Sequence, residues 1–392
     1  MQSFEYFCPT EIVFGSGAES RVAEKIRNHG GSRVMILYGG GSAIKSGLIP
    51  KIERLMLTGG LAALKVVGGV KPNPRVNFIR HAIREAVDAK IDFVLAVGGG
   101  SVIDTAKAVA LGAANPDVEI WNHWSGKVRL QKSLPVGVVL TIAAAGSETS
   151  DSAVLTDEES GLKRGAITPR PVFAIMNPEL ALSVPRYPLF CGIADIIMHT
   201  LERYFTPIDG NEFTDMVAES LIKNVMAQSK VLLADAQNLH AMSEIMWCGS
   251  VSHTGFTGLG RQKDFSAHKL GHELSGRFDV AHGASLTTVW ASWARTVCDV
   301  KLERFAQFGE RIFGIIDGTV DERAHKAIDA MENYFREIDI PTKFTELGIG
   351  VQSDAELEFL ADMVTSNGTK KVATFRPLDR QTVIEIYRKA NC

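Results

Sequence analysis

Short runs of β-branched and aliphatic residues alternate with amphipathic segments over the first 185 residues of the chain. The runs that we predict to be strands are residues 11–15, 33–38, 62–67, 93–97, 136–141 and 172–176. Helical spacing of apolar residues is found at residues 20–28, 76–89 and 102–111. Strands that alternate with helices favour a parallel sheet whose two faces are both covered by helices.

The pattern of apolar positions changes near residue 185. From Tyr187 onward strand-like runs almost disappear, and apolar residues recur with the 3.6-residue period of helices. The helices expected are residues 189–205, 213–233, 239–256, 265–274, 285–298, 300–313, 319–338 and 355–364. We therefore predict an α/β domain over residues 1–185 and an all-helical domain over residues 186–392. A ligand site is expected in the cleft between two such domains.

The composition indicates an ordinary globular protein but says little about its function. Apolar residues make up 45% of the chain and charged residues 22%, as in ordinary soluble globular proteins. The net charge of −3 gives no reason to expect nucleic acid or an anionic membrane as a partner. No apolar run is long enough to span a membrane, and the first residues lack the pattern of a secretory signal. The five cysteines are scattered and form no CxxC pair, so free thiols and a cytoplasmic location are expected.

Histidines with helical spacing stand out in the second half of the chain. His268 and His272 are four residues apart, and Asp195 and His199 repeat this spacing, so each pair lies on one face of a helix. His282 follows His268 by fourteen residues. One such pair is more often explained by hydrogen-bonded core residues. Three imidazoles and a carboxylate together, however, would hold a divalent transition metal.

A glycine-rich turn, Gly98-Gly99-Gly100-Ser101, lies between a predicted strand and a predicted helix. Glycines let backbone N–H groups approach a phosphate closely, and the N-terminus of the following helix carries partial positive charge. The stretch is neither GxGxxG nor a P-loop. From the local sequence alone, a dinucleotide cradle and a plain tight turn are therefore equal alternatives.

A second glycine-rich turn, Gly39-Gly40-Gly41-Ser42, follows an earlier strand. In nucleotide-binding folds an acid near such a turn binds the adenosine ribose hydroxyls and would repel a 2′-phosphate. Residues 39–44 contain no acid, and Ser42 and Lys45 are small or positive instead. This favours NADP(H) over NAD(H), with a flexible turn as the alternative.

Two further segments of the α/β half present small or polar groups. Asn73 lies between two prolines, where a stiff backbone would hold its amide in place, although a plain turn is an equal alternative. Residues 143–150, which include Ser147, are small and polar. Such side chains would let a flat ring or a pyrophosphate lie against the backbone.

Taken together, these motifs resemble the iron-containing (group III) alcohol dehydrogenase family, and most closely its butanol dehydrogenase and NADPH-dependent aldehyde reductase branch. The resemblance covers nearly the whole chain. It rests on residues 9–17, 72–74, 98–107 and 177–180 and on the spaced Asp/His/His/His set. It implies an N-terminal Rossmann-like domain and an all-helical C-terminal domain, the dehydroquinate synthase-like architecture, with metal and nicotinamide between them.

The resemblance also assigns metal ligands and a proton relay. Asp195, His199, His268 and His282 would bind the metal, with Fe(II) as the expected ion and Zn²⁺, Ni²⁺ or Co²⁺ as competitors. His272 would lie beside the metal without binding it. There it would relay a proton or, at equal odds, only hydrogen-bond to the ligands.

The resemblance further implies a set of cofactor contacts. Asn73, Gly100, Ser101, Thr141 and Lys163 would contact the cofactor, and Asp104 would brace the glycine loop. To these the glycine-rich and small-residue stretches add Gly40, Gly41, Ser42, Gly99 and Ser147. Ala145 departs from many relatives, which have Thr there, and this removes one hydroxyl from the expected contacts.

The expected reaction is hydride transfer between NADP(H) and a short-to-medium primary alcohol or aldehyde, in an apolar pocket. Candidates to line that pocket are Trp121, Trp124, Phe256 and Phe265. The alternatives are a glycerol-type polyol dehydrogenase, a dehydroquinate synthase-like lyase and a nucleotide-binding sensor without turnover. The segment around His268 has few cations for the anionic substrate of such a lyase. A homo-oligomer, most simply a dimer, is expected by analogy with the family.

Overall fold

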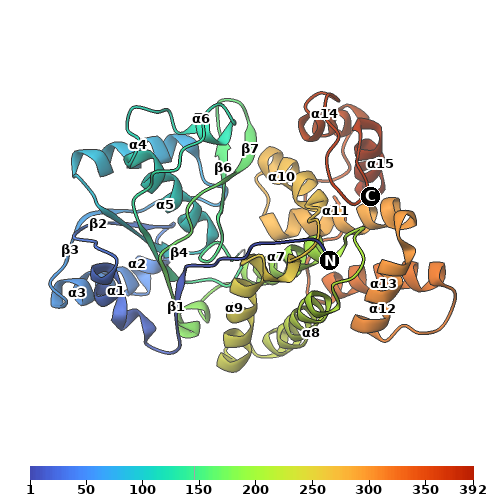
Figure 1. Ribbon diagram of the computed structural model, residues 1–392, viewed down its shortest axis with the longest axis horizontal. Helices are drawn as coiled ribbons and strands as arrows, with labels where there is room; N and C mark the ends of the chain where they lie inside the picture. The colour runs from blue at the N-terminus through green and yellow to red at the C-terminus, as the bar shows by residue number, and fades with distance from the viewer. Residues whose placement is uncertain (145) are drawn as a thin grey trace. The chain divides into compact units, whose positions relative to one another are not determined.

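The computed structural model describes residues 1–144 and 146–392, which divide into two compact units (Figure 1). The α/β unit is Phe7–Val184, and the helical unit is Pro185–Cys392 together with Met1–Tyr6. The first six residues belong to the helical unit because Gln2 N donates to Gly260 O at 2.9 Å and the Tyr6 ring contacts that of Phe256. We had placed them in the α/β domain.

A six-stranded sheet forms the core of the α/β unit. Its strands are β1 (Glu11–Phe14), β2 (Arg33–Tyr38), β3 (Ala62–Val67), β4 (Phe93–Gly98), β5 (Val136–Leu140) and β8 (Phe173–Met176). They lie in the order β1-β8-β5-β4-β2-β3, and every pairing between them is parallel. β4 and β5 are buried at each residue, as the continuous apolar runs predict for central strands covered on both faces. The predicted parallel sheet is confirmed.

Helices cover both faces of this sheet, with α1 and α3 on one side and α4 and α5 on the other (Figure 1). The helices of the unit are α1 (Val22–Asn28), α2 (Ser42–Lys45), α3 (Leu48–Thr58), α4 (Val76–Asp88), α5 (Gly100–Ala113) and α6 (Trp121–Trp124). Ile26 of α1 and Ile52 of α3 are fully buried in one core with Ile36 and Leu95 of the sheet. Alternate side chains of β2 and β4 thus supply this core.

An antiparallel hairpin, β6 (Ser152–Asp157) and β7 (Leu162–Ile167), was not predicted. Its second strand carries Lys163, Arg164 and Gly165, which interrupt the alternation of apolar and polar residues on which strand prediction depends. The hairpin closes at Gly161, whose φ of 68° suits glycine and whose N–H donates to Asp157 O at 2.9 Å.

The helical unit is built around α7 and α11. Its helices are α7 (Arg186–Tyr204), α8 (Glu212–Ala234), α9 (Leu239–His253), α10 (Ser266–Phe278), α11 (His282–Val297), α12 (Leu302–Phe313), α13 (Val320–Glu337), α14 (Asp354–Thr365) and α15 (Arg380–Ala390). α7 is buried without interruption from Leu189 to Tyr204, which marks it as a central helix. None of the helices in the described part of the chain combines the length and apolar character that a bilayer crossing requires.

Candidate metal and cofactor sites

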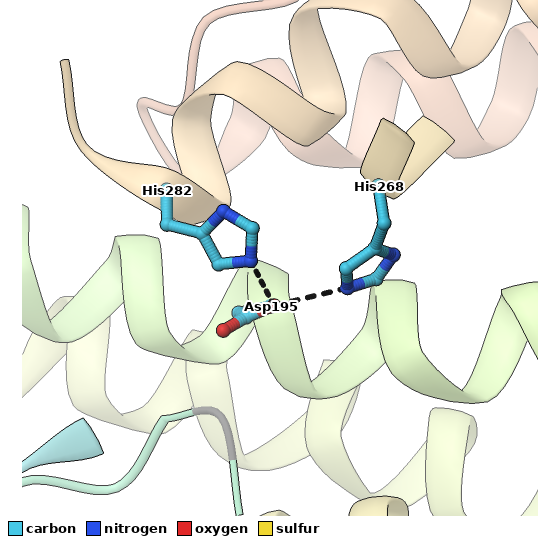
Figure 2. Close-up of side chains that lie close together, drawn as sticks. All are labelled: Asp195, His268 and His282. Carbon is cyan, nitrogen blue, oxygen red and sulfur yellow. Dashed lines mark ion pairs between the residues drawn. The ribbon is translucent and has the colours of Figure 1, made fainter. Parts of the chain in front are cut away.

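Three helices of the helical unit bring an acid and two histidines together. Asp195 lies in the middle of α7, His268 in the first turn of α10, and His282 is the first residue of α11. Figure 2 shows the three side chains pointing toward one another from these separate helices. We had predicted that the helix near His282 would begin only at residue 285. Its earlier start sets His282 rigidly on the first helical turn.

The Asp195 carboxylate is at the centre of this group. Its Oδ1 lies 3.6 Å from His199 Nδ1, 3.8 Å from His268 Nε2 and 3.8 Å from His282 Nε2. Ligand atoms about 2.1 Å from a tetrahedral metal would be about 3.4 Å apart, which is close to these separations. Asp195, His268 and His282 each offer a ligand atom within 4.8 Å of the other two. His199 is not one of these three, but its Nδ1 is the imidazole nitrogen nearest to Asp195 Oδ1, at 3.6 Å, and it remains a predicted fourth ligand.

Within the described part of the chain, three donor atoms of the site lack any other partner that would satisfy them. Asp195 Oδ1, His199 Nδ1 and His268 Nε2 are buried and have no hydrogen-bond partner among the described residues. Buried polar atoms are normally paired, and a cation is the partner that would accept lone pairs from all three. Imidazole nitrogen and carboxylate oxygen suit Fe²⁺, Zn²⁺, Co²⁺ and Ni²⁺. These residues therefore fit a divalent transition metal.

Gly283 allows α11 to reach the metal-site face of α7. A Cβ at this position would lie 2.0 Å from the carbonyl oxygen of Cys191, closer than side chains ever approach. The first turn of α11, and His282 with it, therefore packs one helical turn before Asp195. Burial raises the pKa of the Cys191 thiol to about 11, and this sulfur is not in the group of possible ligand atoms around Asp195, so Cys191 serves the packing of the two helices.

Glu202 is a buried carboxylate of the site that the sequence patterns did not single out. Its Oε1 accepts hydrogen bonds from the backbone N of His268 at 2.8 Å and from His268 Nδ1 at 3.1 Å. Because a carboxylate accepts, Nδ1 carries the proton, and the lone pair of Nε2 is left on the side of Asp195. A signal was available, since Glu202 follows Asp195 by seven residues and shares its helix face.

The pKa values of the buried residues His268 and His199 are shifted in opposite directions. Burial disfavours the charged form of His268, but the carboxylates of Asp195 and Glu202 more than offset this and raise the pKa of His268. Burial, together with the neighbouring His253 and His268, holds the pKa of His199 well below its ordinary value. His199 is thus a neutral imidazole, which is the form that binds metals.

His272, the predicted proton relay, lies beside the cluster. Its ring centroid is 5.2 Å from that of His282 and 6.1 Å from that of His268, and the residue is half-buried. It is one helical turn beyond His268 on α10. This position leaves the side chain partly open to solvent, as a proton relay requires, and its role remains a prediction.

The aromatic residues proposed as pocket lining are divided between the units. Trp124 belongs to the core of the α/β unit, because it is buried and its Nε1 donates to Ala153 O at 3.0 Å. Phe265 instead lies next to the metal-site histidines, with its ring centroid 5.0 Å from that of His268. Of the four candidates, Phe265 is the one that the structure puts beside the donor atoms.

In the α/β unit the two glycine-rich turns leave neighbouring strands at the same edge of the sheet. β2 and β4 pair in parallel with Tyr38 opposite Val97, so residues 39–42 and 98–101 emerge side by side. The strand order reverses here, since β3 lies on one side of β2 and β4 on the other. Open parallel sheets bind ligands at such a switch point. Thr141, whose N donates to Gly98 O at 3.2 Å, belongs to the same edge.

Both turns lead into helices in the way that phosphate sites require. Gly99 precedes α5, whose first residues are Gly100 and Ser101, and Gly41 precedes α2, which begins at Ser42. Gly41 has a φ of 110°, which only glycine adopts readily, and a Cβ on Gly40 would meet open space. The free N–H groups at the start of α5 are suited to an anion.

The remaining predicted cofactor residues form two hydrogen-bonded pairs. Lys163 Nζ donates to Asn73 Oδ1 at 2.8 Å, which ties β7 to the loop before α4. Ser147 Oγ donates to Asp104 Oδ1 at 2.5 Å, and Asp104 Oδ2 accepts from Val154 N at 2.8 Å. Asp104 therefore braces the loop after β5 and the strand β6. The expectation about Ala145 lies outside the described residues.

Family models match both units of the chain. The model described as iron-containing alcohol dehydrogenase covers residues 9–178, and the C-terminal model of the Fe-containing alcohol dehydrogenase family covers residues 191–391. NADH-dependent butanol dehydrogenase A of Clostridium acetobutylicum is 32% identical over 100% of both chains. NADPH-dependent aldehyde reductase YqhD of Escherichia coli is 32% identical over 89% of this chain and 90% of that protein.

Solved structures agree with this relationship. The crystal structure of NADH-dependent butanol dehydrogenase A from Thermotoga maritima has a TM-score of 0.95 and 32% identity, and the alignment covers 100% of this chain and 99% of that one. The structure of Escherichia coli YqhD has a TM-score of 0.93 and 29% identity, with 99% of each chain covered. The chain is therefore an oxidoreductase that belongs to the iron-containing alcohol dehydrogenase family, in its butanol dehydrogenase and aldehyde reductase branch.

Proposed function

We propose that this alcohol dehydrogenase is a metal-dependent, NADP(H)-linked enzyme that interconverts short-to-medium primary alcohols and aldehydes of the butanol and butanal type. The observation that carries the proposal is the set of three imidazole nitrogens 3.6–3.8 Å from one buried carboxylate oxygen, that of Asp195. The names of the relatives support the substrate class, because they include butanol dehydrogenases and an aldehyde reductase.

Asp195, His199, His268 and His282 would hold the metal, and the family favours Fe(II). Bound there, the ion supplies Lewis acidity toward the oxygen of the alcohol or aldehyde. Asp195 gives the site its anionic ligand, and Glu202 keeps the lone pair of His268 turned to the same side. Asp195 thus offsets the charge of the cation, and Glu202 orients the ring of His268.

The cofactor would bind at the switch point of the sheet. When bound, its nicotinamide supplies or accepts the hydride. The residues that would contact it are Gly40, Gly41, Ser42, Asn73, Gly99, Gly100, Ser101, Thr141, Ser147 and Lys163. The absence of an acid in residues 39–44 and the charge of Lys45 support NADP(H). The relatives' names support either cofactor, since one is NADH-dependent and another NADPH-dependent.

His272 would move the proton that accompanies hydride transfer. An aldehyde that is reduced must gain a proton on its oxygen, and a half-buried imidazole beside His282 connects the site with solvent.

Purified protein loaded anaerobically with Fe²⁺ and supplied with NADPH and butanal tests the proposal. We expect NADPH oxidation that is faster than NADH oxidation and that is lost after chelation and restored by Fe²⁺. Full activity of the chelated, metal-free protein would contradict metal dependence. Failure to oxidise NADPH with any short aldehyde would contradict the substrate assignment. A homodimer, also a prediction, can be checked by light scattering on the same sample.

A further inference from the structure

Two other imidazoles lie close to the His199 imidazole. Its ring centroid lies 4.6 Å from that of His268, with 29° between the ring planes, and 4.0 Å from that of His253, with 39° between the planes. His253 is the last residue of α9 and was not among the predicted site residues. A ring with two imidazoles at these distances can turn only if a neighbour moves, so the two neighbouring rings constrain the plane of His199.

His253 is in turn oriented by Arg203. Nη2 of Arg203 lies 2.9 Å from Nδ1 of His253, and because a guanidinium only donates, this Nδ1 accepts and the His253 proton is on Nε2. Arg203 is only 3% exposed, and its Nη1 donates to the backbone O of His199 at 2.6 Å. Its guanidinium also lies over the ring of Phe265, 4.9 Å from the centroid. Arg203 is therefore fixed at three points.

Two consecutive residues of α7 thus anchor the two rings that lie against His199. Glu202 holds His268, and Arg203 holds His253. Glu202 and Arg203 are also opposite in charge. The Glu202 carboxylate offsets the positive charge of the buried Arg203 guanidinium, which lies near the proposed cation site. With Nδ1 of His253 occupied by Arg203, this nitrogen is not available as a metal ligand.

We infer that His253, oriented by Arg203, is a positioning residue that sets the ring plane of His199 and thereby the affinity of the site for its divalent ion. The inference rests on the proposed metal-binding function. The residues that hold metal-bound histidines in place commonly change metal affinity about 10–100-fold when they are removed. His253 acts through its contact with the ligand His199 and not by a hydrogen bond to it, so its removal should weaken metal binding by about tenfold or more, within that range.

The test compares His253→Ala, which removes both ring and acceptor, with His253→Phe, which keeps a flat ring but not the acceptor. Full-length proteins loaded with Zn²⁺ are titrated with a chelator, and the visible absorption of Co²⁺-loaded samples reports the ligand geometry. We expect His253→Ala to weaken Zn²⁺ binding about tenfold or more and to shift the Co²⁺ bands. His253→Phe should fall between His253→Ala and the wild type.

His123→Ala is the matched control. His123 is another buried imidazole, 8% exposed, with hydrogen bonds to Ile167 O and Leu130 N, but it belongs to the α/β unit. Its removal should leave Zn²⁺ affinity and the Co²⁺ spectrum unchanged, and thermal melting identifies any variant that fails to fold. An Arg203→Lys variant, which loses the planar fork, should behave like His253→Phe.

Wild-type affinity and an unchanged Co²⁺ spectrum in a folded His253→Ala protein would overturn the inference. Equal losses in His253→Ala and His253→Phe would do the same, because the effect would then follow the hydrogen bond and not the ring. If the wild-type protein bound no metal at all, the proposed function itself would fail. The two failures are therefore distinguishable.

Discussion

Asp195 provides the anionic group on which the three imidazoles of the metal site converge. Asp195→Asn keeps the size of the side chain and removes its charge, so we expect metal retention after dialysis to fall at least about tenfold, as measured by elemental analysis. Asp321→Asn is the control, since Asp321 and His325 have the same i, i+4 spacing and the same 3.6 Å separation but lie exposed on α13. Full retention in Asp195→Asn would remove Asp195 from the ligand set.

His272 allows metal binding and proton transfer to be separated. His272→Ala should leave the metal content full, because the ring lies outside the group of donor atoms. Turnover with butanal and NADPH should fall on the order of 100-fold, the usual contribution of a positioned acid or base. Steady-state kinetics checks this, and an unchanged kcat would show that His272 moves no proton in the slow step.

The titration of His268 gives the metal site a pH dependence. Its pKa is raised above the ordinary 6.5, whereas that of His199 is lowered well below it. A proton on His268 must leave before Nε2 can bind a cation, so Zn²⁺ affinity should fall as the pH drops through the raised pKa of His268. Chelator competition between pH 6 and pH 9 measures the effect. A Zn²⁺ affinity that stays constant over that pH interval would contradict the raised pKa of His268.

The same pKa directions have opposite consequences for the metal-free fold. The raised pKa of His268 contributes stability at low pH that is lost as the pH rises through that pKa. The lowered pKa of His199 means that the unfolded chain binds its proton more readily, so stability falls as the pH drops below about 6.5. The unfolding free energy of the apoprotein should therefore be highest at a pH between the lowered pKa of His199 and the raised pKa of His268.

At the scale of elements, the approach of α11 to α7 depends on Gly283. Gly283→Ala puts a Cβ 2.0 Å from Cys191 O, so the helices must separate. We expect a loss of about 1–3 kcal/mol in unfolding free energy and weaker metal binding through displacement of His282. Gly165→Ala on β7 is a suitable control, because its Cβ would meet Val154 at an ordinary 3.7 Å. Denaturant unfolding measures the stability of both variants, and chelator titration measures their metal affinity.

Helices and strands could be predicted from the sequence where their apolar residues follow a regular pattern. β4 and β5 are buried throughout, and the helical period of the second half is regular, so apolar spacing alone indicated the two classes of structure. The β6–β7 hairpin, α3 and α15 were not predicted. Charged residues such as Lys163 and Arg164 break the pattern of the hairpin, and polar residues are frequent in α15. In these elements tertiary contacts, such as Tyr387 Oη donating to Leu270 O at 2.9 Å, outweigh local preference.

The metal site was predictable only in part. Spacing of i, i+4 selects Asp195/His199, but it selects the exposed Asp321/His325 pair equally well. The family resemblance separated the two, whereas local pattern could not. Glu202 could have been found from its place seven residues after Asp195 on the same helix face. His253 could not be recognised, because a stacked ring gains its role from residues distant in the chain.

The whole molecule has an interleaved order of units. The α/β unit is one continuous stretch, Phe7–Val184, while the helical unit combines Pro185–Cys392 with the first six residues. During synthesis the α/β unit is complete as soon as its own stretch has left the ribosome. Met1–Tyr6, although made before the α/β unit, must wait for Phe256 and Gly260 to be made before it can form its contacts with them. The metal-site unit is thus completed after the α/β unit, and the segment Met1–Tyr6 is without its packing partners while the α/β unit is being made.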